Sequence, residues 1–439
     1  MKVPKNKALL MIAYWFPPIK SCSLRSYYAY LEFRKYFSTV KVITTKNRDL
    51  FPQEPLPIQK ENISAIPTFD FRSLRGRKTK GASFNLEASK KTKTVRRILK
   101  LLESFPFNLL LGEGGLLYIF GAFFKALRII KKEKITHLFT SYRPYSDHFV
   151  AFLLKLWKPK IVWIADFRDI HADPNRGEVY GKKFQRWCNR LILSKANLLT
   201  TVSGGLANYL KKYNPAVYVL RNGINSSQPI DYQSHKSDIF RITYTGSLYP
   251  GLQTTLVFFK ILAELLEKGA IKKSKIQLVY AGKDDDIWQE WIQAFRLQEI
   301  CRNRRMVSFA AAKQIQSESQ LNLLLSWSSP SLNGILTGKL YEYLAAGNPI
   351  LSIINGTKDE EMEAIFEKCQ AGIVVYNDVK SEGAVREFLL GLYKEWLQNG
   401  FVSKKMNFEA LEDFKWDKQM QQFMRLLVKT NQLAPDTAS

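Results

Sequence analysis

Short apolar runs alternate with helix-length segments along almost the whole chain, and this alternation limits the possible folds more than any other feature. Consecutive parallel strands need a crossover segment, usually a helix, because a tight turn cannot join them. Runs that are apolar on both faces are typical of a sheet covered by helices on both sides. The predicted strands are 8–14, 40–44, 137–141, 161–165, 198–202, 217–220, 240–245, 276–281, 307–309, 321–325, 350–353 and 372–375.

The alternation is interrupted at 222–238, a polar and turn-rich stretch. In a chain of 439 residues this break favours two domains, since roughly 100–200 residues per domain is typical. We predict an N-terminal domain at 1–225, a C-terminal domain at 239–410, and a helical segment at 411–439 that returns to the first domain. The expected fold class is α/β, with two Rossmann-like, doubly wound parallel sheets facing a central cleft that binds ligands. A long loop with weak structure is expected at 47–93.

The composition excludes several classes of protein. A hydrophobic content of 46% with 24% charged residues is that of a globular protein, not a disordered one. The four cysteines are far apart and form no C-x-x-C pair, which argues against a disulfide framework or a zinc site. No apolar run reaches about 18 residues, so no membrane-spanning helix is predicted. The start, 1–16, fits a buried strand better than a signal peptide, and a cytoplasmic location is therefore expected.

The net charge of +27 is unusually high and is unevenly distributed. Segment 71–100 contains eleven Lys and Arg residues and one acidic residue, Glu87. It is a solvated loop, a patch for an anionic membrane surface, or a nucleic-acid-binding segment. Nucleic acid is the least favoured partner, because no helix-turn-helix, RNP or zinc-finger pattern accompanies the charge. The neighbouring apolar stretch 107–130 is either a helix packed on its sheet or an interfacial helix that enters lipid.

The most specific segment is a glycine-bearing loop followed by a helix, at 334–350. A helix that begins at Thr337 can direct the free N–H groups around Gly338 toward a phosphate. Lys339 places a positive charge in the first helical turn, where it opposes the helix dipole, and a bound anion would explain that placement. Glu342, one turn further on, can accept hydrogen bonds from a ribose diol. The alternative is a surface helix with an ordinary lysine and glutamate.

Polar residues also follow the strand predicted at 161–165, at the sheet edge where such folds bind ligands. One interpretation is that Asp166 or Asp169 orients an acceptor hydroxyl or acts as a base, while Arg168 pairs with phosphate. The other interpretation is a local Arg–Asp ion pair that closes the turn. His171 is a further candidate base, although a single loop histidine is more often structural or exposed.

Two more polar segments have alternative explanations. Tyr142 and Arg143 follow the strand at 137–141, where they either line the acceptor side or precede a capped helix. The three aspartates at 284–286 suggest a metal site, but acidic residues at a helix start are ordinary and we prefer that explanation. No metal is therefore predicted.

Taken together, a series of short motifs resembles the family 4 glycosyltransferases, in particular members that act in bacterial surface polysaccharide assembly. The segment TGKLYEYLA at 337–345 is similar to the donor-binding motif of that family. The resemblance covers nearly the whole chain. Its other motifs are YWFPP at 14–18 with SLR at 23–25, WIADFRD at 163–169, TVS at 201–203, RNGI at 221–224, YTGSLYPG at 244–251 and LVYAG at 278–282.

The resemblance implies a GT-B fold and a retaining, metal-independent glycosyltransferase. A nucleoside diphosphate sugar is the co-substrate, and no cofactor is implied. Gly334 stands eight positions before Glu342, where the family carries another glutamate. The residues implied in donor binding are Thr245, Gly246, Ser247, Gly282, Thr337, Gly338, Leu340 and Glu342. With the residues at the strand ends included, the predicted catalytic residues are Lys339, Arg168 and Asp166, and the predicted acceptor-side residues are Arg25, Tyr142, Arg143, Asp169 and His171.

The expected function is transfer of a hexosyl-type sugar to a polysaccharide or lipid-linked acceptor in cell-surface glycan synthesis. The expected partners are the nucleotide sugar, the acceptor and an anionic membrane surface, with the protein peripheral on the inner face of the plasma membrane. Two alternatives remain open. One is a sugar-nucleotide epimerase with a GT-B fold, and the other is a non-catalytic, transferase-like protein that binds a membrane or nucleic acid.

Overall fold

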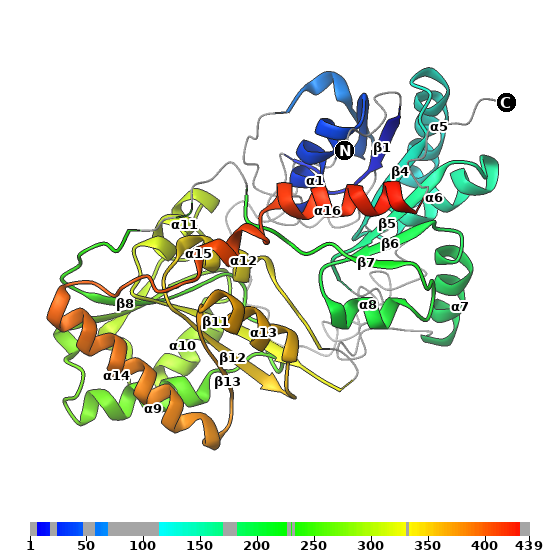
Figure 1. Cartoon of the computed structure of the whole chain (residues 1–439). Coiled ribbons are helices and arrows are strands. Elements are labelled where there is room, and N and C mark those ends of the chain that lie inside the picture. The colour runs from blue at the N-terminus through cyan, green and yellow to red at the C-terminus, as the bar shows by residue number, and fades with distance from the viewer. Residues whose placement is uncertain are drawn as a thin grey trace. The chain divides into compact units, whose positions relative to one another are not determined.

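The computed structural model describes residues 7–17, 24–46, 58–68, 114–169, 182–225, 230, 233–330 and 333–430. The chain divides into two compact units, one of Met1–Arg221 with Gln419–Ser439 and one of Asn222–Lys418. Each unit contains one parallel sheet, and helices connect its strands (Figure 1). The predicted α/β fold with two Rossmann-like sheets is therefore confirmed.

The sheet of the first unit has seven strands in the order β3-β2-β1-β4-β5-β6-β7. Every neighbouring pair is parallel. Because the chain leaves β1 for one side of the sheet and later returns to its other side, the strand order reverses between β1 and β4. The strands are β1 (Ala8–Ile12), β2 (Thr39–Thr45), β3 (Ile63–Ile66), β4 (His137–Tyr142), β5 (Val162–Phe167), β6 (Leu198–Thr201) and β7 (Val217–Val219).

The helices of this unit lie on opposite faces of the sheet, because parallel crossovers are right-handed. The crossover through α1 runs from β1 toward β2, whereas the crossovers through the four helices α5 to α8 run in the opposite direction across the sheet. Those four helices therefore cover one face. The helices are α1 (Leu24–Tyr36), α5 (Leu116–Lys132), α6 (Ser146–Trp157), α7 (Lys182–Leu193), α8 (Gly204–Leu210) and α16 (Trp416–Lys429), the last of which carries the chain from the second unit back into the first.

The sheet of the second unit has six strands in the order β10-β9-β8-β11-β12-β13, again all parallel. Here the order reverses between β8 and β11. The strands are β8 (Phe240–Thr245), β9 (Ile276–Ala281), β10 (Cys301–Asn303), β11 (Leu321–Ser328), β12 (Ile350–Gly356) and β13 (Gly372–Tyr376). The helices are α9 (Leu256–Glu267), α10 (Asp285–Ala294), α11 (Phe309–Ser317), α12 (Gly338–Ala346), α13 (Glu360–Cys369), α14 (Glu382–Asn399) and α15 (Phe408–Glu412).

Two predicted elements differ from the structure. The strand predicted at 307–309 is wrong, since Ser308 caps α11 by accepting a hydrogen bond from the Ala311 amide. The edge strand is β10, which is only three residues long and carries little apolar pattern. Strand β3 lies within the loop predicted at 47–93, because its four residues were too few to stand out there.

In the described residues no helix is both long enough and apolar enough to span a membrane.

Candidate functional site

The predicted donor residues surround the point in the second sheet where the strand order reverses. Thr245 ends β8, and α12 follows the neighbouring strand β11. Open α/β sheets bind ligands at such a point, beyond the carboxyl ends of the strands. At this point Lys339 of α12 contacts Gly246 and Ser247, which follow the end of β8.

Gly246 makes room for the side chain of Lys339. Its φ of 118° lies in a region that other residues rarely adopt. A Cβ atom on Gly246 would overlap Cε of Lys339. The backbone conformation therefore favours glycine at this position, and a larger residue would also displace the lysine side chain.

The Lys339 ammonium is held by neutral oxygen atoms. Nζ donates to Oη of Tyr244 at 2.6 Å and to the carbonyl oxygen of Ser247 at 3.2 Å. It also lies 4.4 Å from the centre of the Tyr244 ring. No carboxylate within the described residues forms an ion pair with it. Burial lowers the pKa of Lys339 to about 8, although the nearby carboxylates of Glu342 and Asp284 act in the opposite direction.

Tyr244 belongs to an aromatic stack that fixes its position. Its ring is stacked with Tyr280 at a centroid distance of 6.1 Å and with Trp288 at 6.0 Å. Burial raises the pKa of Tyr244 well above its usual value of 10, so the phenol is neutral. Its hydroxyl donates to the Ser247 carbonyl at 2.7 Å, which leaves the phenol oxygen free to accept from Lys339. The sequence analysis missed Tyr244, although it begins the YTGSLYPG motif.

Glu342 is positioned by Gln316, a second residue that the sequence analysis missed. The Gln316 side chain is 1% exposed, and its Nε2 lies 3.1 Å from Oε2 of Glu342 and 2.8 Å from Oγ1 of Thr245. The Tyr343 hydroxyl lies 3.0 Å from the Thr245 amide, which donates to it. One buried amide therefore joins the end of β8 to the carboxylate on α12.

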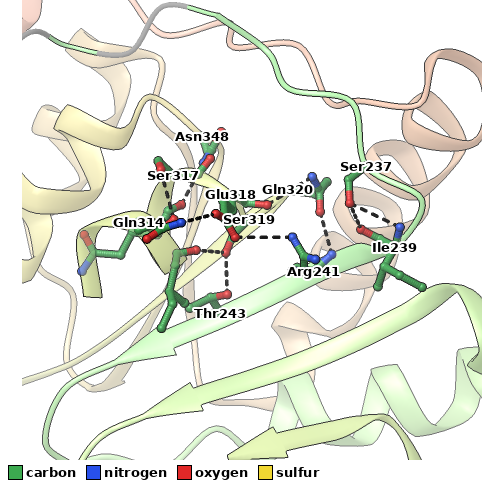
Figure 2. Close-up of polar contacts among 12 residues, drawn as sticks. Ser237, Ile239, Arg241, Thr243, Gln314, Ser317, Glu318, Ser319, Gln320 and Asn348 are labelled. Atoms are coloured by element: carbon green, nitrogen blue, oxygen red, sulfur yellow. Dashed lines mark hydrogen bonds and ion pairs between the residues drawn. The ribbon is translucent and has the colours of Figure 1, made fainter. Parts of the chain in front are cut away.

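Gln316 itself is held by contacts at the end of α11 (Figure 2). Nδ2 of Asn348 donates to the carbonyl oxygens of Gln316 and Ser317, each at 2.9 Å. Ser319 shares a hydrogen bond with Thr243 of β8, and Oε1 of Gln320 accepts from the Arg241 amide at 2.7 Å. These contacts fix α11 to both α12 and the sheet.

The remaining donor-side residues act through their backbone or their small size. Thr337 precedes α12 in an extended conformation and makes no capping bond with its side chain, and Gly338 is exposed. The Leu340 side chain is fully buried, so only its backbone faces the helix start. A Cβ on Gly282 would overlap the Gly246 carbonyl oxygen. Gly282 therefore allows the ends of β8 and β9 to approach closely.

The loop before α12 is fixed by a buried carboxylate. Gly334 has a φ of 67°, and its amide donates to Oδ2 of Asp359 at 3.1 Å. The other oxygen of Asp359 accepts from the Met362 amide at 3.1 Å and caps α13. Burial raises the pKa of Asp359, and these two amides oppose that rise.

The aspartates at 284–286 make structural contacts. Oδ2 of Asp284 accepts a hydrogen bond from the Leu248 amide at 2.8 Å, and Asp285 pairs with Asn303. Asp285 and Asp286 begin α10, as preferred from the sequence. In the part of the chain that the structure describes, no three His, Cys, Asp or Glu side chains are grouped so as to hold a metal ion.

In the first unit, Asp166 is a buried structural carboxylate. Nε and Nη2 of Arg25 lie 2.9 and 2.6 Å from its two oxygens. Thr200 donates to it at 2.8 Å and Ser141 at 3.3 Å, and the residue is fully buried. Nη2 of Arg25 also donates to the Leu220 carbonyl at 2.8 Å. Because both oxygens are already bonded, this geometry opposes the catalytic role predicted for Asp166 and the acceptor contact predicted for Arg25.

The other predicted acceptor-side residues follow two neighbouring strands. Tyr142 ends β4 and pairs in register with Phe167 of β5, so Arg143 and the pair Arg168 and Asp169 leave the same sheet edge. Tyr142 is buried, Arg143 is exposed, and Arg168 and Asp169 are half-buried. His171 lies outside the described residues.

His148 lies in the first turn of α6, close to the end of β4, and it is not suited to proton transfer. Burial lowers its pKa to about 3, so the imidazole is neutral. The Trp163 indole donates to Oγ1 of Thr140, which in turn lies 2.7 Å from Nδ1 of His148. The ring is therefore held by a buried hydroxyl that also accepts from an indole, and no carboxylate hydrogen bond to it is seen in the described residues.

Comparison with known proteins supports the fold. No model of a protein family matches the chain, and a search of curated proteins finds no match either. Among solved structures, sucrose-phosphate synthase from Thermosynechococcus elongatus has a TM-score of 0.60 at 12% identity, covering 98% of this chain and 100% of the other. A glycosyltransferase from Rickettsia africae has a TM-score of 0.57 at 14% identity, with coverage of 98% and 100%. S. aureus TarM, in a complex with UDP, fondaparinux and α-GlcNAc-glycerol, has a TM-score of 0.57 at 9% identity, with coverage of 96% and 99%. At these identities the likeness shows the fold alone, and that fold is GT-B.

We predict that removing one partner of the Arg25–Asp166 pair destabilises the first unit. Asp166→Asn or Arg25→Met leaves a charge buried without its partner, which costs about 3–5 kcal/mol of unfolding free energy. Asp169→Asn, at a half-buried neighbour, is the control and should change stability by less than about 1 kcal/mol. Urea unfolding followed by fluorescence measures each value. An Asp166→Asn protein that is as stable as wild type but has lost activity would restore the catalytic assignment.

Proposed function

We propose that the chain transfers a sugar from a nucleoside diphosphate sugar to an acceptor, with the donor bound in the second unit. One observation carries this proposal. The Lys339 ammonium is half-buried, lacks a carboxylate partner among the described residues, and stands in the first turn of a helix of nine residues. A cation there opposes the helix dipole and has lost hydration, so a bound anion would stabilise both features.

The anion that fits is a diphosphate. The amides of Gly338 and Lys339 at the start of α12 and the Lys339 ammonium are the donors that we assign to its oxygens, whereas the Leu340 amide already donates to the Thr337 carbonyl at 3.2 Å. Gly246, which carries no side chain, leaves room for the Lys339 side chain beside the end of β8. Glu342 lies one turn along α12 and is oriented by Gln316, so we assign it to the ribose hydroxyls of the nucleotide.

The chemistry follows from this placement. The bond between the anomeric carbon and the diphosphate oxygen breaks, and the diphosphate departs with the electron pair. The acceptor oxygen forms the new bond to that carbon on the same face, and its proton passes to the departing diphosphate. Preorganised cations and helix amides stabilise the charge that develops on the leaving group. This retaining, metal-independent course is what the resemblance to family 4 implies.

The position of Gly334 bears on how the sugar is held. The family carries a glutamate there, whereas the left-handed conformation and the Asp359 contact make Gly334 a backbone element. We propose that backbone groups of this loop bind the sugar in place of a carboxylate. Arg143, Arg168 and Asp169 in the first unit are then the groups assigned to the acceptor side.

We assign the acceptor to the polysaccharide or lipid-linked class, with a hexosyl-type donor sugar and a role in surface glycan synthesis at the inner face of the plasma membrane. The motif resemblance supports this assignment. The neighbouring structures add that TarM was solved with UDP.

The direct test is nucleoside diphosphate binding. Lys339→Met and Glu342→Gln should each weaken binding of the preferred member of a panel of UDP, GDP, ADP, CDP and dTDP by about ten- to hundredfold, since each removes a bond to a charged group. Isothermal titration calorimetry measures the affinity, and donor turnover is followed in parallel. Lys394→Met and Glu367→Gln, on exposed faces of α14 and α13, are the matched controls. Unchanged affinity in both site variants would remove the proposed site, and an isomerised donor without acceptor would favour an epimerase.

Binding should also depend on pH through Lys339. Its lowered pKa of about 8 means that the free protein loses this proton near pH 8, and a bound dianion raises the pKa again. Diphosphate binding then takes up a proton, so affinity should fall above about pH 8, toward roughly tenfold per pH unit. Calorimetry between pH 7 and about pH 9.5 tests this, with Lys339→Met expected to give a flat profile. A wild-type profile that is equally flat contradicts the assignment.

Gln316→Leu should reveal whether that residue positions Glu342. Loss of the hydrogen bond to Glu342 should weaken binding of the ribonucleoside diphosphate by roughly three- to tenfold. The effect should disappear with the 2′,3′-dideoxy nucleotide, which has no hydroxyls for Glu342. Gln314→Leu, at an exposed glutamine on the same helix, is the control and should leave affinity unchanged. A loss that is equal for both nucleotides would show a general disturbance of α11 instead.

A further inference from the structure

Exposed apolar side chains are concentrated on one part of the first unit. Among the described residues, fourteen large hydrophobic side chains are exposed, and nine of them belong to the helices α5, α6 and α7. These helices cover one face of the first sheet, and α6 contacts both of its neighbours (Figure 1). The nine residues are Leu116, Leu117, Phe120, Phe124, Leu156, Trp157, Phe184, Trp187 and Leu191, which we call the α5–α7 surface.

On α5 the exposed residues face away from the core. Leu117, Phe120 and Phe124 have the i, i+3, i+7 spacing of one helix face, and they are 66%, 54% and 57% exposed. The core contacts are made from the opposite face, through residues such as Tyr118 and Ala122. Two apolar stripes therefore run along this helix, and the sheet accounts for only one of them.

The same spacing recurs on α7, where the core does not explain it. Phe184, Trp187 and Leu191 are 50%, 59% and 45% exposed, while the buried face includes the polar residues Gln185 and Asn189. The rings of Phe184 and Trp187 are stacked at a centroid distance of 5.8 Å. A helix whose outward face is more apolar than much of its inward face has a function at its surface.

Exposed basic residues accompany this surface, whereas the acidic residue that follows α5, Glu133, is half-buried. Within α5 and α7 every charged side chain is a lysine or an arginine, and the one acidic residue of α6, Asp147, is fully buried. The exposed cations are Lys125, Arg128, Lys131 and Lys132 on α5, Lys158 and Lys160 after α6, and Lys182, Lys183, Arg186 and Arg190 on α7.

We infer that the α5–α7 surface binds an anionic lipid bilayer and lies parallel to it, with its apolar side chains in the headgroup region. Charge distinguishes the possible occupants, because a purely apolar partner would not require eight exposed cations on α5 and α7 with no acidic residue on either helix. Tryptophan beside lysine and arginine is the combination that suits a membrane interface. This inference does not depend on the donor site, because all of its residues belong to the first unit.

Vesicle binding by the full-length protein tests the inference. Sedimentation with phosphatidylcholine vesicles, with and without phosphatidylglycerol, gives the partition coefficient. Wild type should bind the anionic vesicles at least about tenfold more strongly than the neutral ones. Trp187→Asp with Phe120→Asp should lower that binding by about tenfold or more, and Lys183→Glu with Arg186→Glu should do the same.

Matched variants in the second unit are the controls. Leu397→Asp changes a leucine that is 54% exposed, as is Phe120, and Lys272→Glu with Lys275→Glu reverses two exposed charges. Both should bind vesicles as wild type does. Circular dichroism and nucleoside diphosphate affinity verify that all variants are folded. Equal binding to neutral and anionic vesicles, equal loss in the control variants, or self-association or nucleic-acid binding in place of vesicle binding would each overturn the inference.

Discussion

The second unit is organised around one desolvated ammonium group. Lys339 reaches from α12 to the end of β8, and the space that it needs fixes Gly246 as glycine. Its partners are a phenol and a carbonyl, so its charge is stabilised by dipoles and a ring face but not neutralised. The stacking of Tyr244 with Tyr280 and Trp288 holds the phenol oxygen within hydrogen-bond distance of the lysine. In the function that we propose, these fixed partners preorganise the site for an anion before any ligand arrives.

In the first unit, the charged residues of one short motif have different structural environments. Within the motif at 163–169, the carboxylate of Asp166 accepts hydrogen bonds from Arg25, Thr200 and Ser141. Arg168 and Asp169 lie beyond the carboxyl end of β5. These residues differ in role because Asp166 lies within β5 and is fully buried, whereas Arg168 and Asp169 follow the end of that strand and are half-buried. The buried pair links the motif at 23–25 with the one at 163–169, so both motifs are explained by the architecture of the unit. In the proposed function, the acceptor is therefore assigned to residues beyond the strand ends, namely Arg143, Arg168 and Asp169.

The features that the sequence could predict are those determined by residues close together along the chain. The strands β8 and β9 match their predicted bounds, since long apolar runs between turn signals determine them locally. Lys339 and Glu342 were identifiable because their spacing within one helix carries the information. Gln316 was not, because it is 26 residues from Glu342 and lies in a helix that was predicted in part as a strand. The partner of Asp166 lies 141 residues away, and no local pattern connects the two.

The net charge of +27 includes cations in two physically different environments. The cations on α5 and α7 are exposed and numerous, so they act over a Debye length of about 8 Å at physiological salt and weaken together as salt rises. Lys339 is single and half-buried, and salt screens such a group much less. The exposed group can bring the protein to an anionic surface without selecting a particular ligand. In the proposed function, the half-buried Lys339 ammonium selects a diphosphate but contributes little to attraction over distance. The exposed cations and Lys339 therefore have complementary roles.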